Sequence, residues 1–498
     1  VDRRLAVWYD FRPRSPAGDQ PGVGMFQTLD GAQAFIRDRG IEQIDLKFCD
    51  LWGRWHHLTL SATRLDEELM DRGIGFDGSS VGFKTVSSGD MVMVPELESG
   101  FVDPFWRLPT LSFVCTTLEA ASRAPFPYDP RAILRRSEQR LRDHGVADNS
   151  RWGPEFEFYV FDGVSYENTV NAASYRVDSG EGDWRSHEMG SGYTMPLKGG
   201  YHAIPPRDQL FDLRSEICRH LDAIGVPVKY HHHEVGGPGQ CEIETPLLGC
   251  IQAADAAMIV KYVARMAARE VGQTVTFMPK PLFGEAGSGM HFHQRLEGAD
   301  GRNLFYGESG YASLSELARW YIGGLLEHGG AVLAFTSPST NSYRRLVPGY
   351  EAPVSAIYSA GNRSAAVRIP SYANRPDNAR IEFRPPDASC NPYLAVAAQL
   401  MAGLDGIRRE LDPTEAGFGP VEDDIFSWTE DERRQRIRSL PGSLGEAMDA
   451  LAADHDFLLD GDVFSEDLID RWIERKRDEQ RRVQQRPHPY EVELYYDL

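Results

Sequence analysis

The chain contains 498 residues, of which 41% are hydrophobic and 26% charged, and its formal net charge is −21. Its length is too great for one small core and indicates two or more domains. Its acidic balance argues against a nucleic-acid partner, because binding to phosphates requires a basic patch.

The cysteines and the apolar segments narrow the class of protein further. Six cysteines are scattered without a CxxC pair, so we expect neither a disulfide framework nor a zinc site built on paired cysteines. No run of 18 apolar residues occurs, so we expect no membrane partner. Together with the acidic charge, these features favour a cytoplasmic enzyme.

Residues 1–24 are predicted to be a disordered leader. They carry several charges and the stretch Ser15-Pro16-Ala17-Gly18 but no apolar core of the kind found in signal peptides. Whether translation begins at Met25 is left open.

A first domain is predicted over residues 25–124. It starts with a helix from Leu29 and continues into a hairpin, with strands at 43–49 and 54–60. A loop rich in glycine and serine follows at 75–80. Residues 124–128 contain two prolines, which disfavour regular structure and indicate a linker.

A second domain is predicted over residues 125–498, where strands alternate with long helices. Asp129 and Pro130 supply an N-cap and a first-turn proline for a helix that ends near Gly145. No internal repeat or low-complexity tract occurs. Five further helices are expected, at 208–224, 253–271, 313–328, 392–411 and 465–483.

Four segments of this second domain place ionisable side chains at every second position. In a strand, such side chains point to the same face. For any one segment a solvated sheet face is the simpler interpretation, but four in one chain favour a common site. The polar residues are Glu155 and Glu157; Glu242 and Glu244; His291 and His293; and Arg380, Glu382 and Arg384.

The mixture of side chains indicates the chemistry. Several carboxylates with few imidazoles favour Mg²⁺ or Mn²⁺ over zinc or copper. Arginines on the same surface suit bidentate recognition of carboxylate and phosphate. Divalent metals and arginines around a polyphosphate are the components of phosphoryl transfer.

Seven motifs, in order along the chain, resemble those of the bacterial type I glutamine synthetases, and the resemblance extends from about residue 25 to residue 498. It implies an α+β fold, with a small N-terminal β-grasp-like domain at 25–124 followed by a large catalytic α/β half-barrel domain at 125–498 that ends in a helical clasp. The motifs are Lys198-Gly199-Gly200-Tyr201, His231-His232-His233-Glu234-Val235, Phe277-Met278-Pro279-Lys280-Pro281, Gly287-Ser288-Gly289-Met290-His291, residues 341–353, Asn362-Arg363-Ser364 and Pro487-His488-Pro489-Tyr490-Glu491.

The resemblance also implies roles for individual residues. Two or three Mg²⁺ or Mn²⁺ ions per site are expected, the first held by Glu157, Glu234 and Glu242, and the second by Glu155, His291 and Glu382. Arg345 and Arg384 resemble the clamps for glutamate and phosphate. Gly287 resembles a backbone contact to the amino acid, and Arg363 resembles the arginine that stabilises the transferred phosphoryl group. The nucleotide-side positions of the family are matched by His293, Arg368 and Arg380. The ammonium pocket is matched by Asp77, Ser80, Tyr201 and Glu234. Glu351 resembles the residue of the flap that closes over the intermediate.

Other positions are interpreted as structural or as departures from the family pattern. Glu244 has no family counterpart and is predicted to be a surface acid, and His231 and His232 are predicted to be structural. Asp90 is given a minor supporting role at a subunit contact. Ala286 replaces a family asparagine and Gly361 a family arginine, which puts affinity for glutamate and nucleotide in doubt.

The activity that the resemblance implies is glutamine synthesis from glutamate, ammonium and ATP through γ-glutamyl phosphate. It also implies a dodecamer of two hexameric rings, with each site shared between neighbouring subunits. A γ-glutamyl-amine ligase and a non-catalytic relative are the alternatives. Phe426 stands where many relatives carry an adenylylated tyrosine, so no adenylylation is expected there.

Overall fold

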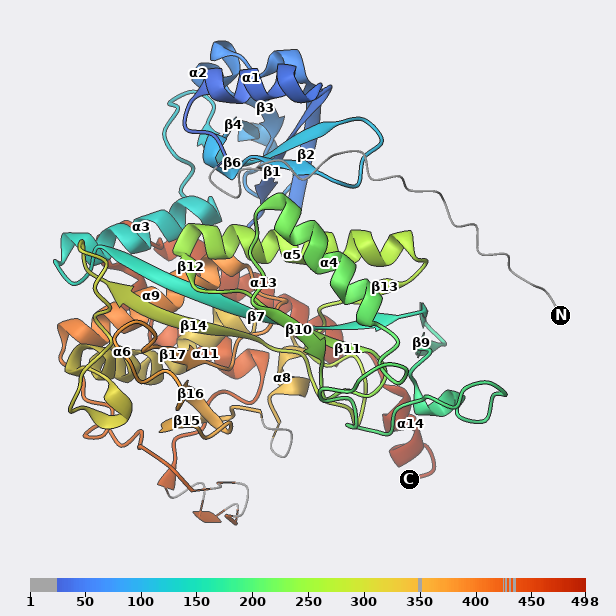
Figure 1. The fold of residues 1–498 in the computed structure, drawn as a ribbon. Helices are drawn as coiled ribbons and strands as arrows, with labels where there is room; N and C mark the ends of the chain where they lie inside the picture. Colours follow the sequence, from blue (N-terminus) through green and yellow to red (C-terminus); the bar gives the residue numbers. More distant parts are fainter. Residues whose placement is uncertain (1–24, 348–351, 424, 426–427, 430, 433–435) are drawn as a thin grey trace.

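The computed structural model describes residues 25–347, 352–423, 425, 428–429, 431–432 and 436–498 (Figure 1). The predicted leader, the predicted flap residue Glu351 and the predicted unmodified Phe426 therefore lie outside the described residues. Every helix in the described ranges is too short or too polar to cross a membrane.

The N-terminal part is a small sheet covered by two helices (Figure 1). Helix α1 (Leu29–Arg39) begins where the Thr28 side chain accepts a hydrogen bond from the Gly31 amide, and it ends at Gly40 in a left-handed conformation. The sheet order is β2-β1-β6-β4-β3, with β5 also on β6, and β1 pairs with β6 in parallel. The other elements are β1 (Gln43–Cys49), β2 (Trp55–Ser61), α2 (Glu67–Arg72), β3 (Ile74–Asp77), β4 (Asp90–Pro95), β5 (Phe101–Asp103) and β6 (Thr110–Glu119).

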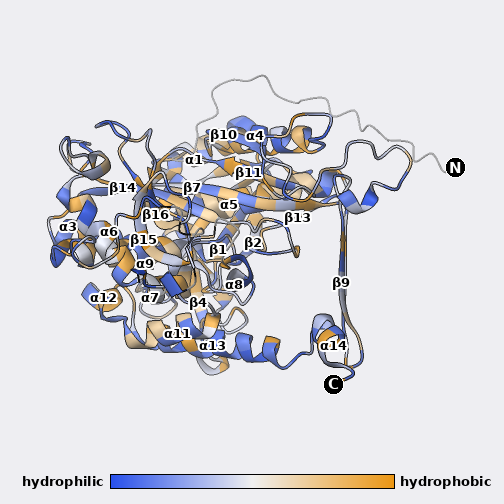
Figure 2. Ribbon diagram, turned by 90° about the horizontal axis from the view of Figure 1, so that it is seen from below, coloured by the Kyte–Doolittle hydropathy of each residue, from blue (hydrophilic) through white to orange (hydrophobic). Residues whose placement is uncertain are grey.

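The larger part is built on a nine-stranded sheet. Its order is β10-β11-β7-β14-β17-β16-β15, with β12 and β13 also paired to β7. A separate hairpin, β8 (Gly163–Asn168) and β9 (Ala173–Asp178), projects from it (Figure 2). The strands are β7 (Asn149–Phe161), β10 (Tyr230–His233), β11 (Gln240–Glu244), β12 (Leu248–Gly249), β13 (Thr274–Thr276), β14 (Met290–Glu297), β15 (Ser355–Ala360), β16 (Ala365–Ile369) and β17 (Ile381–Phe383).

All six long helices expected in this part are present, with shifted ends. Helix α6 starts at Glu316 because Ser315, rather than Ser313, accepts the capping hydrogen bond, from the Ala318 amide. Helix α5 starts three residues earlier than expected, directly after Gly249. The six are α3 (Pro130–Asp143), α4 (Phe211–Ile224), α5 (Cys250–Glu270), α6 (Glu316–Glu327), α9 (Pro392–Arg408) and α13 (Glu466–Gln484); the shorter α7 (Gly329–Thr336), α8 (Ser342–Arg345), α11 (Leu444–Ala453), α12 (Asp456–Leu459) and α14 (Pro489–Tyr495) had not been expected.

The core lies between the large sheet and the helices that cover one of its faces. Helix α5 packs on β7 and β13, and α9 packs on α3, α5, α6 and α7. Hydrophobic residues gather on these central elements, whereas the outer helices are largely hydrophilic (Figure 2). The opposite face of the sheet is left to carry polar side chains. A small β-grasp-like domain followed by a large α/β domain is the expected fold class, which is confirmed.

The two parts meet at the turn between β1 and β2. Asn391 caps α9 and also donates a 3.0 Å hydrogen bond from Nδ2 to the Asp50 carbonyl oxygen. Trp52 stacks on Trp472 of α13 with ring centroids 5.4 Å apart. The first hairpin is thereby fixed to the core of the larger part.

Candidate active site

The register of the large sheet places the four polar segments on one face, as their spacing predicted. Strands β11, β7, β14 and β17 are consecutive neighbours. Residues that face each other across the strands form rows: His232, Glu242 and Glu157 in the first; Glu244, Glu155 and His291 in the second; and His293, Glu382 and Arg368 in the third.

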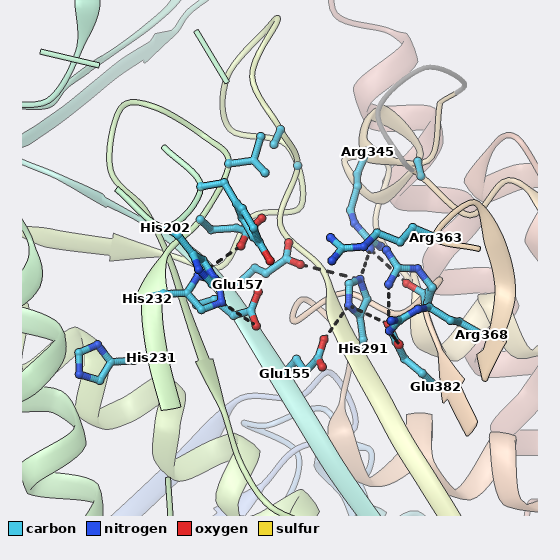
Figure 3. A pocket seen from close by; sticks show the side chains of 18 of the residues that line it. Glu155, Glu157, His202, His231, His232, His291, Arg345, Arg363, Arg368 and Glu382 are labelled. Carbon is cyan, nitrogen blue, oxygen red and sulfur yellow. Dashed lines mark hydrogen bonds and ion pairs between the residues drawn. The ribbon is translucent and has the colours of Figure 1, made fainter. Parts of the chain in front are cut away.

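A cavity of about 810 Å³ lies over this face (Figure 3). It contains ionisable side chains that come from strands far apart in the sequence, together with glycine and tyrosine from loops. Most of the candidate residues therefore converge on one cavity. Those that line it are Glu155, Glu157, Tyr201, Glu234, Glu242, Gly287, His291, Arg345, Arg363, Arg368, Glu382 and Arg384.

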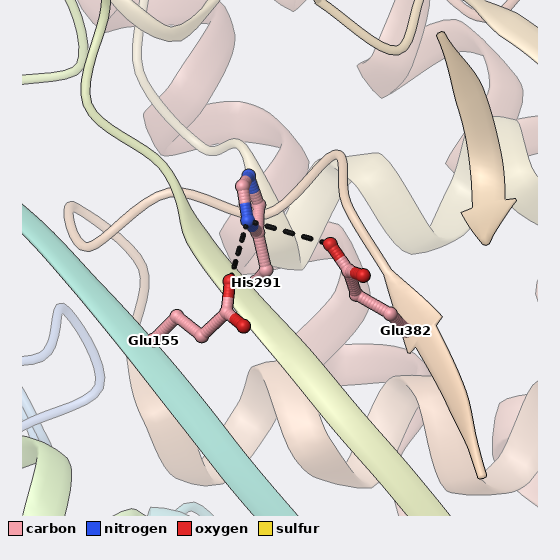
Figure 4. Close-up of side chains that lie close together, drawn as sticks. All are labelled: Glu155, His291 and Glu382. Carbon is pink, nitrogen blue, oxygen red and sulfur yellow. Dashed lines mark hydrogen bonds and ion pairs between the residues drawn. The ribbon is translucent and has the colours of Figure 1, made fainter. Parts of the chain in front are cut away.

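One end of the cavity holds carboxylates that already have cationic partners. His291 Nδ1 lies 3.0 Å from Glu155 Oε2 and 3.7 Å from Glu382 Oε1 (Figure 4). Burial opposes ionisation of Glu382, but Arg384, His293 and His291 together outweigh it and lower the pKa of Glu382 to about 2. Burial is likewise outweighed at Glu155, whose pKa is held well below its usual range by His293 and His291. Both carboxylates are therefore ionised at neutral pH.

At the other end of the cavity, burial and mutual repulsion outweigh the groups that would stabilise ionised carboxylates. Burial, followed by repulsion from Glu157 and Glu242, raises the pKa of Glu234 well above its usual range. Burial and the neighbouring glutamates raise the pKa of Glu242 in the same way. The buried Oε2 atom of Glu234 accepts no hydrogen bond from the described residues. A divalent cation among these oxygens would offset the repulsion, so the donor set fits one.

Arginines cross the cavity above Glu382. Arg384 and Arg368 each donate to one oxygen of this carboxylate. Arg345, at the end of α8, donates to the carbonyl oxygens of Pro385 and Arg384 and places Nη2 3.1 Å from His291 Nε2. The guanidinium groups are thus oriented before any substrate binds.

Two glycines of the recognised motifs are required by this packing. A Cβ atom on Gly289 would lie 2.4 Å from Arg345 Nη2 and 2.7 Å from His291 Nε2. A Cβ atom on Gly200 would lie 2.4 Å from the Glu234 carbonyl oxygen. The small residues let charged groups and backbone approach each other closely.

His293 and Arg380 lie beneath the cavity floor and support it. His293 Nε2 is 2.6 Å from Glu155 Oε1, and Arg380 Nε is 3.3 Å from His293 Nδ1. Arg380 also stacks over the Tyr372 ring, 5.3 Å from its centroid. These two of the three predicted nucleotide-side residues therefore contact residues that line the cavity, and the third, Arg368, lines it.

The prediction that Glu244 is a surface acid is wrong. Glu244 is only 2% exposed, because β11 is an interior strand between β10 and β7 and places this side chain beside Glu155. Lys229 Nζ lies 2.5 Å from Glu244 Oε1 and compensates its charge. His293 Nε2 is 4.0 Å away. The carboxylate belongs to the floor of the site.

Asp77 and Ser80 do not line the cavity. They lie at the end of β3 in the N-terminal part, where Asp77 is exposed. Ser80 Oγ donates to Asp77 Oδ2 at 2.6 Å and Ser79 Oγ donates to Oδ1 at 2.7 Å, and these hydrogen bonds lower the pKa of Asp77. Ala352, next to the undescribed Glu351, lines the cavity.

The two departures from the family pattern occupy different environments. Ala286 lines the cavity, and its carbonyl oxygen accepts a 2.7 Å hydrogen bond from Tyr159 Oη. Gly361 adopts a left-handed conformation, with φ of 82°, just after β15. The sequence had not assigned roles to several other residues that line the cavity; Lys198 lies in a recognised motif, whereas no pattern had singled out His202, Tyr230 and Tyr372.

The fold and the charged cavity define a metal-dependent enzyme of the phosphoryl-transfer type. Two family models match the chain: the glutamine synthetase catalytic domain over residues 127–495 and the glutamine synthetase β-grasp domain over residues 40–120. The chain therefore belongs to the glutamine synthetase family.

Individual relatives agree with this assignment over nearly the whole chain. A glutamine synthetase of Frankia alni is 48% identical over 480 residues, which cover 95% of this chain and 100% of that protein. A glutamine synthetase of a Nostoc species is 46% identical, and the match covers 93% of this chain and 98% of that protein. The solved structure of Plasmodium falciparum glutamine synthetase aligns with a TM-score of 0.85 at 25% identity, covering 96% and 100%. The solved structure of a GmaS complex with ADP aligns with a TM-score of 0.77 at 27% identity, and the match covers 94% of this chain and 99% of that one.

Proposed function

We propose that this enzyme ligates ammonia to L-glutamate at the expense of ATP, giving L-glutamine, ADP and phosphate through γ-glutamyl phosphate. The observation that carries the proposal is the cavity over this sheet face, which six candidate metal ligands and four arginines line. Carboxylates and arginines in this arrangement suit a polyphosphate and an amino acid bound side by side.

The metal ligands are proposed in two sets. Glu157, Glu234 and Glu242 would hold the first Mg²⁺ or Mn²⁺ ion, and the orphaned oxygen of Glu234 supports this set. The second set, proposed to hold the ion beside the ATP phosphates, is Glu155, His291 and Glu382, whose donor atoms lie within 4.8 Å of one another. When bound, the ions would offset phosphate charge and polarise the transferred group.

The arginines bind and orient the two substrates. Arg345 and the backbone at Gly287 are proposed to hold glutamate, so that its side-chain carboxylate faces the γ-phosphate. Arg384 and Arg363 would stabilise negative charge on the transferred phosphoryl group. Arg368, Arg380 and His293 are assigned to the nucleotide side. Arg368 contacts Glu382, His293 contacts Glu155, and Arg380 in turn contacts His293.

Ammonium binding is assigned to Asp77, with Ser80, Tyr201 and Glu234. The lowered pKa of Asp77 keeps it ionised at neutral pH, so it attracts a cation. Ammonium must lose a proton before its nitrogen can attack the acyl phosphate, and Asp77 is the proposed acceptor. Glu351 would close over the intermediate, exclude water and take a proton from the tetrahedral adduct.

The assembly proposed is a dodecamer of two hexameric rings with shared sites. It is supported by the position of Asp77 and Ser80 outside the cavity of their own subunit. A cytoplasmic setting is also proposed, in keeping with six cysteines that are all buried as free thiols.

An assay of ADP formation tests this function against the amine-ligase alternative. Purified enzyme with Mg²⁺ or Mn²⁺, ATP and glutamate is given ammonium or one of a panel of primary amines. We expect ADP formation that requires both glutamate and ammonium. Equal rates with an amine in place of ammonium would favour the γ-glutamyl-amine ligase. No glutamate-dependent ADP formation with any acceptor would support the non-catalytic alternative.

A further inference from the structure

The acidic end of the cavity contains an imidazole that the predicted ligand sets leave out. His232 lies on β10 directly opposite Glu242, which in turn faces Glu157 on β7. The three side chains form one row across adjacent strands on the cavity face of the sheet, and His232 lines the cavity (Figure 3). Its position follows from the same two-residue periodicity that places Glu242 there.

The ring is oriented for a ligand at its outer nitrogen. His232 Nδ1 is 2.9 Å from the His233 carbonyl oxygen, which can only accept, so Nδ1 carries the hydrogen in this contact. Nε2 then presents a lone pair in the neutral ring, and it lies 3.5 Å from Glu242 Oε1. Histidines that bind metals usually donate their other ring N–H to a backbone carbonyl or a carboxylate.

Carboxylates and aromatic rings surround the imidazole. His232, Glu234 and Glu242 offer donor atoms that all lie within 4.8 Å of one another. The buried Glu234 Oε2, which accepts no hydrogen bond from the described residues, is 3.6 Å from His232 Nδ1. Tyr230 stacks near the imidazole and His202 packs against it, at centroid distances of 6.0 Å and 4.4 Å. The ring is thereby held in place beside the carboxylates.

We propose that His232 is a ligand, through Nε2, of the divalent cation assigned to Glu157, Glu234 and Glu242. The inference rests on the proposed function only in that it takes this cation to be present. A nitrogen donor strengthens binding of Mn²⁺ and later transition ions more than binding of Mg²⁺, which prefers oxygen. His232 therefore raises the preference of this position for Mn²⁺.

Electron spin-echo spectroscopy of bound Mn²⁺ tests the proposal, because a directly bound imidazole gives a ¹⁴N coupling. His291 is expected to bind the second cation, so its signal is first removed with His291→Asn. We expect the coupling to persist in this variant and to disappear in the His291→Asn/His232→Asn double variant. The matched control adds His231→Asn, since His231 faces Ile243 and Phe211 rather than the row and should leave the coupling in place.

Titration of Mn²⁺ and Mg²⁺ into the His232→Asn single variant gives a second readout. We expect Mn²⁺ binding to weaken about tenfold or more and Mg²⁺ binding to change less. If the double variant does not fold, the single variant should still show one coupled imidazole in place of two. Persistence of the ¹⁴N coupling without His232 and His291, or its absence when only His291 is replaced, would overturn the inference. Neither readout requires turnover, so wild-type enzyme that shows the coupling but makes no glutamine contradicts the proposed function alone.

Discussion

Ala286 tests substrate recognition at the scale of a single residue. Ala286 lines the cavity beside Gly287, at a position where the resemblance to the type I enzymes implies an asparagine. We expect Ala286→Asn to lower the KM for glutamate by adding one hydrogen bond. A neutral hydrogen bond contributes about 0.5–1.5 kcal/mol, so a decrease of about threefold to tenfold is expected in steady-state kinetics.

The control for this substitution is Ala286→Leu, which adds similar volume without a polar group. The leucine variant should raise the KM for glutamate or leave it unchanged. If Ala286→Asn gives no gain, or if the leucine variant gives the same gain, hydrogen bonding by residue 286 is not what limits glutamate binding here.

The polar residues of the site were predictable because their spacing is local. Glu155 and Glu157 lie two residues apart on one strand. Side chains at this spacing point to the same face of the sheet, so the direction of one gives the direction of the other. The pairing of Glu244 with Lys229 was not predictable, since it depends on the alignment of β11 with the segment before β10. Lone-pair directions, such as that of His232 Nε2, depend on the backbone oxygen opposite and are likewise invisible in sequence.

At the scale of elements, His328 joins four helices of the core. It lies between α6 and α7, with Nε2 2.9 Å from Asp405 of α9 and Nδ1 2.8 Å from Asp454 at the end of α11. Its ring stacks on Phe457 with centroids 4.0 Å apart. Burial disfavours the charged ring, but the hydrogen bonds to the two aspartates outweigh it and raise the pKa of His328 to about 9.

This raised pKa predicts a pH-dependent stability. The contribution is fully present below the ordinary histidine value of about 6.5 and is lost as pH rises through about 9, because the unfolded chain releases the proton first. A shift of this size corresponds to about 3 kcal/mol at most. Thermal unfolding followed by circular dichroism should show the wild-type Tm falling between pH 6.5 and 9.5, with a smaller fall for His328→Gln.

The comparison variant is His455→Gln, since His455 contacts the exposed Glu466. It should keep the wild-type pH dependence. A wild-type Tm that falls no more steeply than that of His328→Gln over this range would show that the two ion pairs contribute little to stability.

The long elements were predictable from their caps and periodicity, and the short ones were not. Asp129 with Pro130 and Asn391 with Pro392 mark helix starts that the structure retains. Helix α8 has four residues and strand β17 three, too few for a period to be measured. These short elements form through packing in the assembled sheet and core, so tertiary contacts rather than local sequence decide them.

At the scale of the whole molecule, the separation of Asp77 from the cavity leads to a complementation test. Asp77→Ala and Glu351→Ala subunits should each be inactive alone. In mixed oligomers, some sites combine Asp77 from one variant with the catalytic domain of the other, and these sites are wild type. Co-expression should therefore restore a fraction of the activity.

A matched mixture gives the control for this restoration. Asp77→Ala subunits combined with Asp77→Ala/Glu351→Ala subunits contain no wild-type site and should stay inactive. If verified mixed oligomers of the two single variants are as inactive as this control, each site is complete within one subunit.

Isotope tracing tests the central claim, ligation through γ-glutamyl phosphate, most directly. The enzyme is supplied with ATP, [¹⁵N]ammonium and glutamate labelled with ¹⁸O in its side-chain carboxylate. The account predicts ¹⁵N in the amide of glutamine by NMR and, by mass spectrometry, one ¹⁸O atom in each phosphate released, because that oxygen leaves the acyl group with the phosphoryl group. Unlabelled phosphate, or an amide without ¹⁵N, would contradict it.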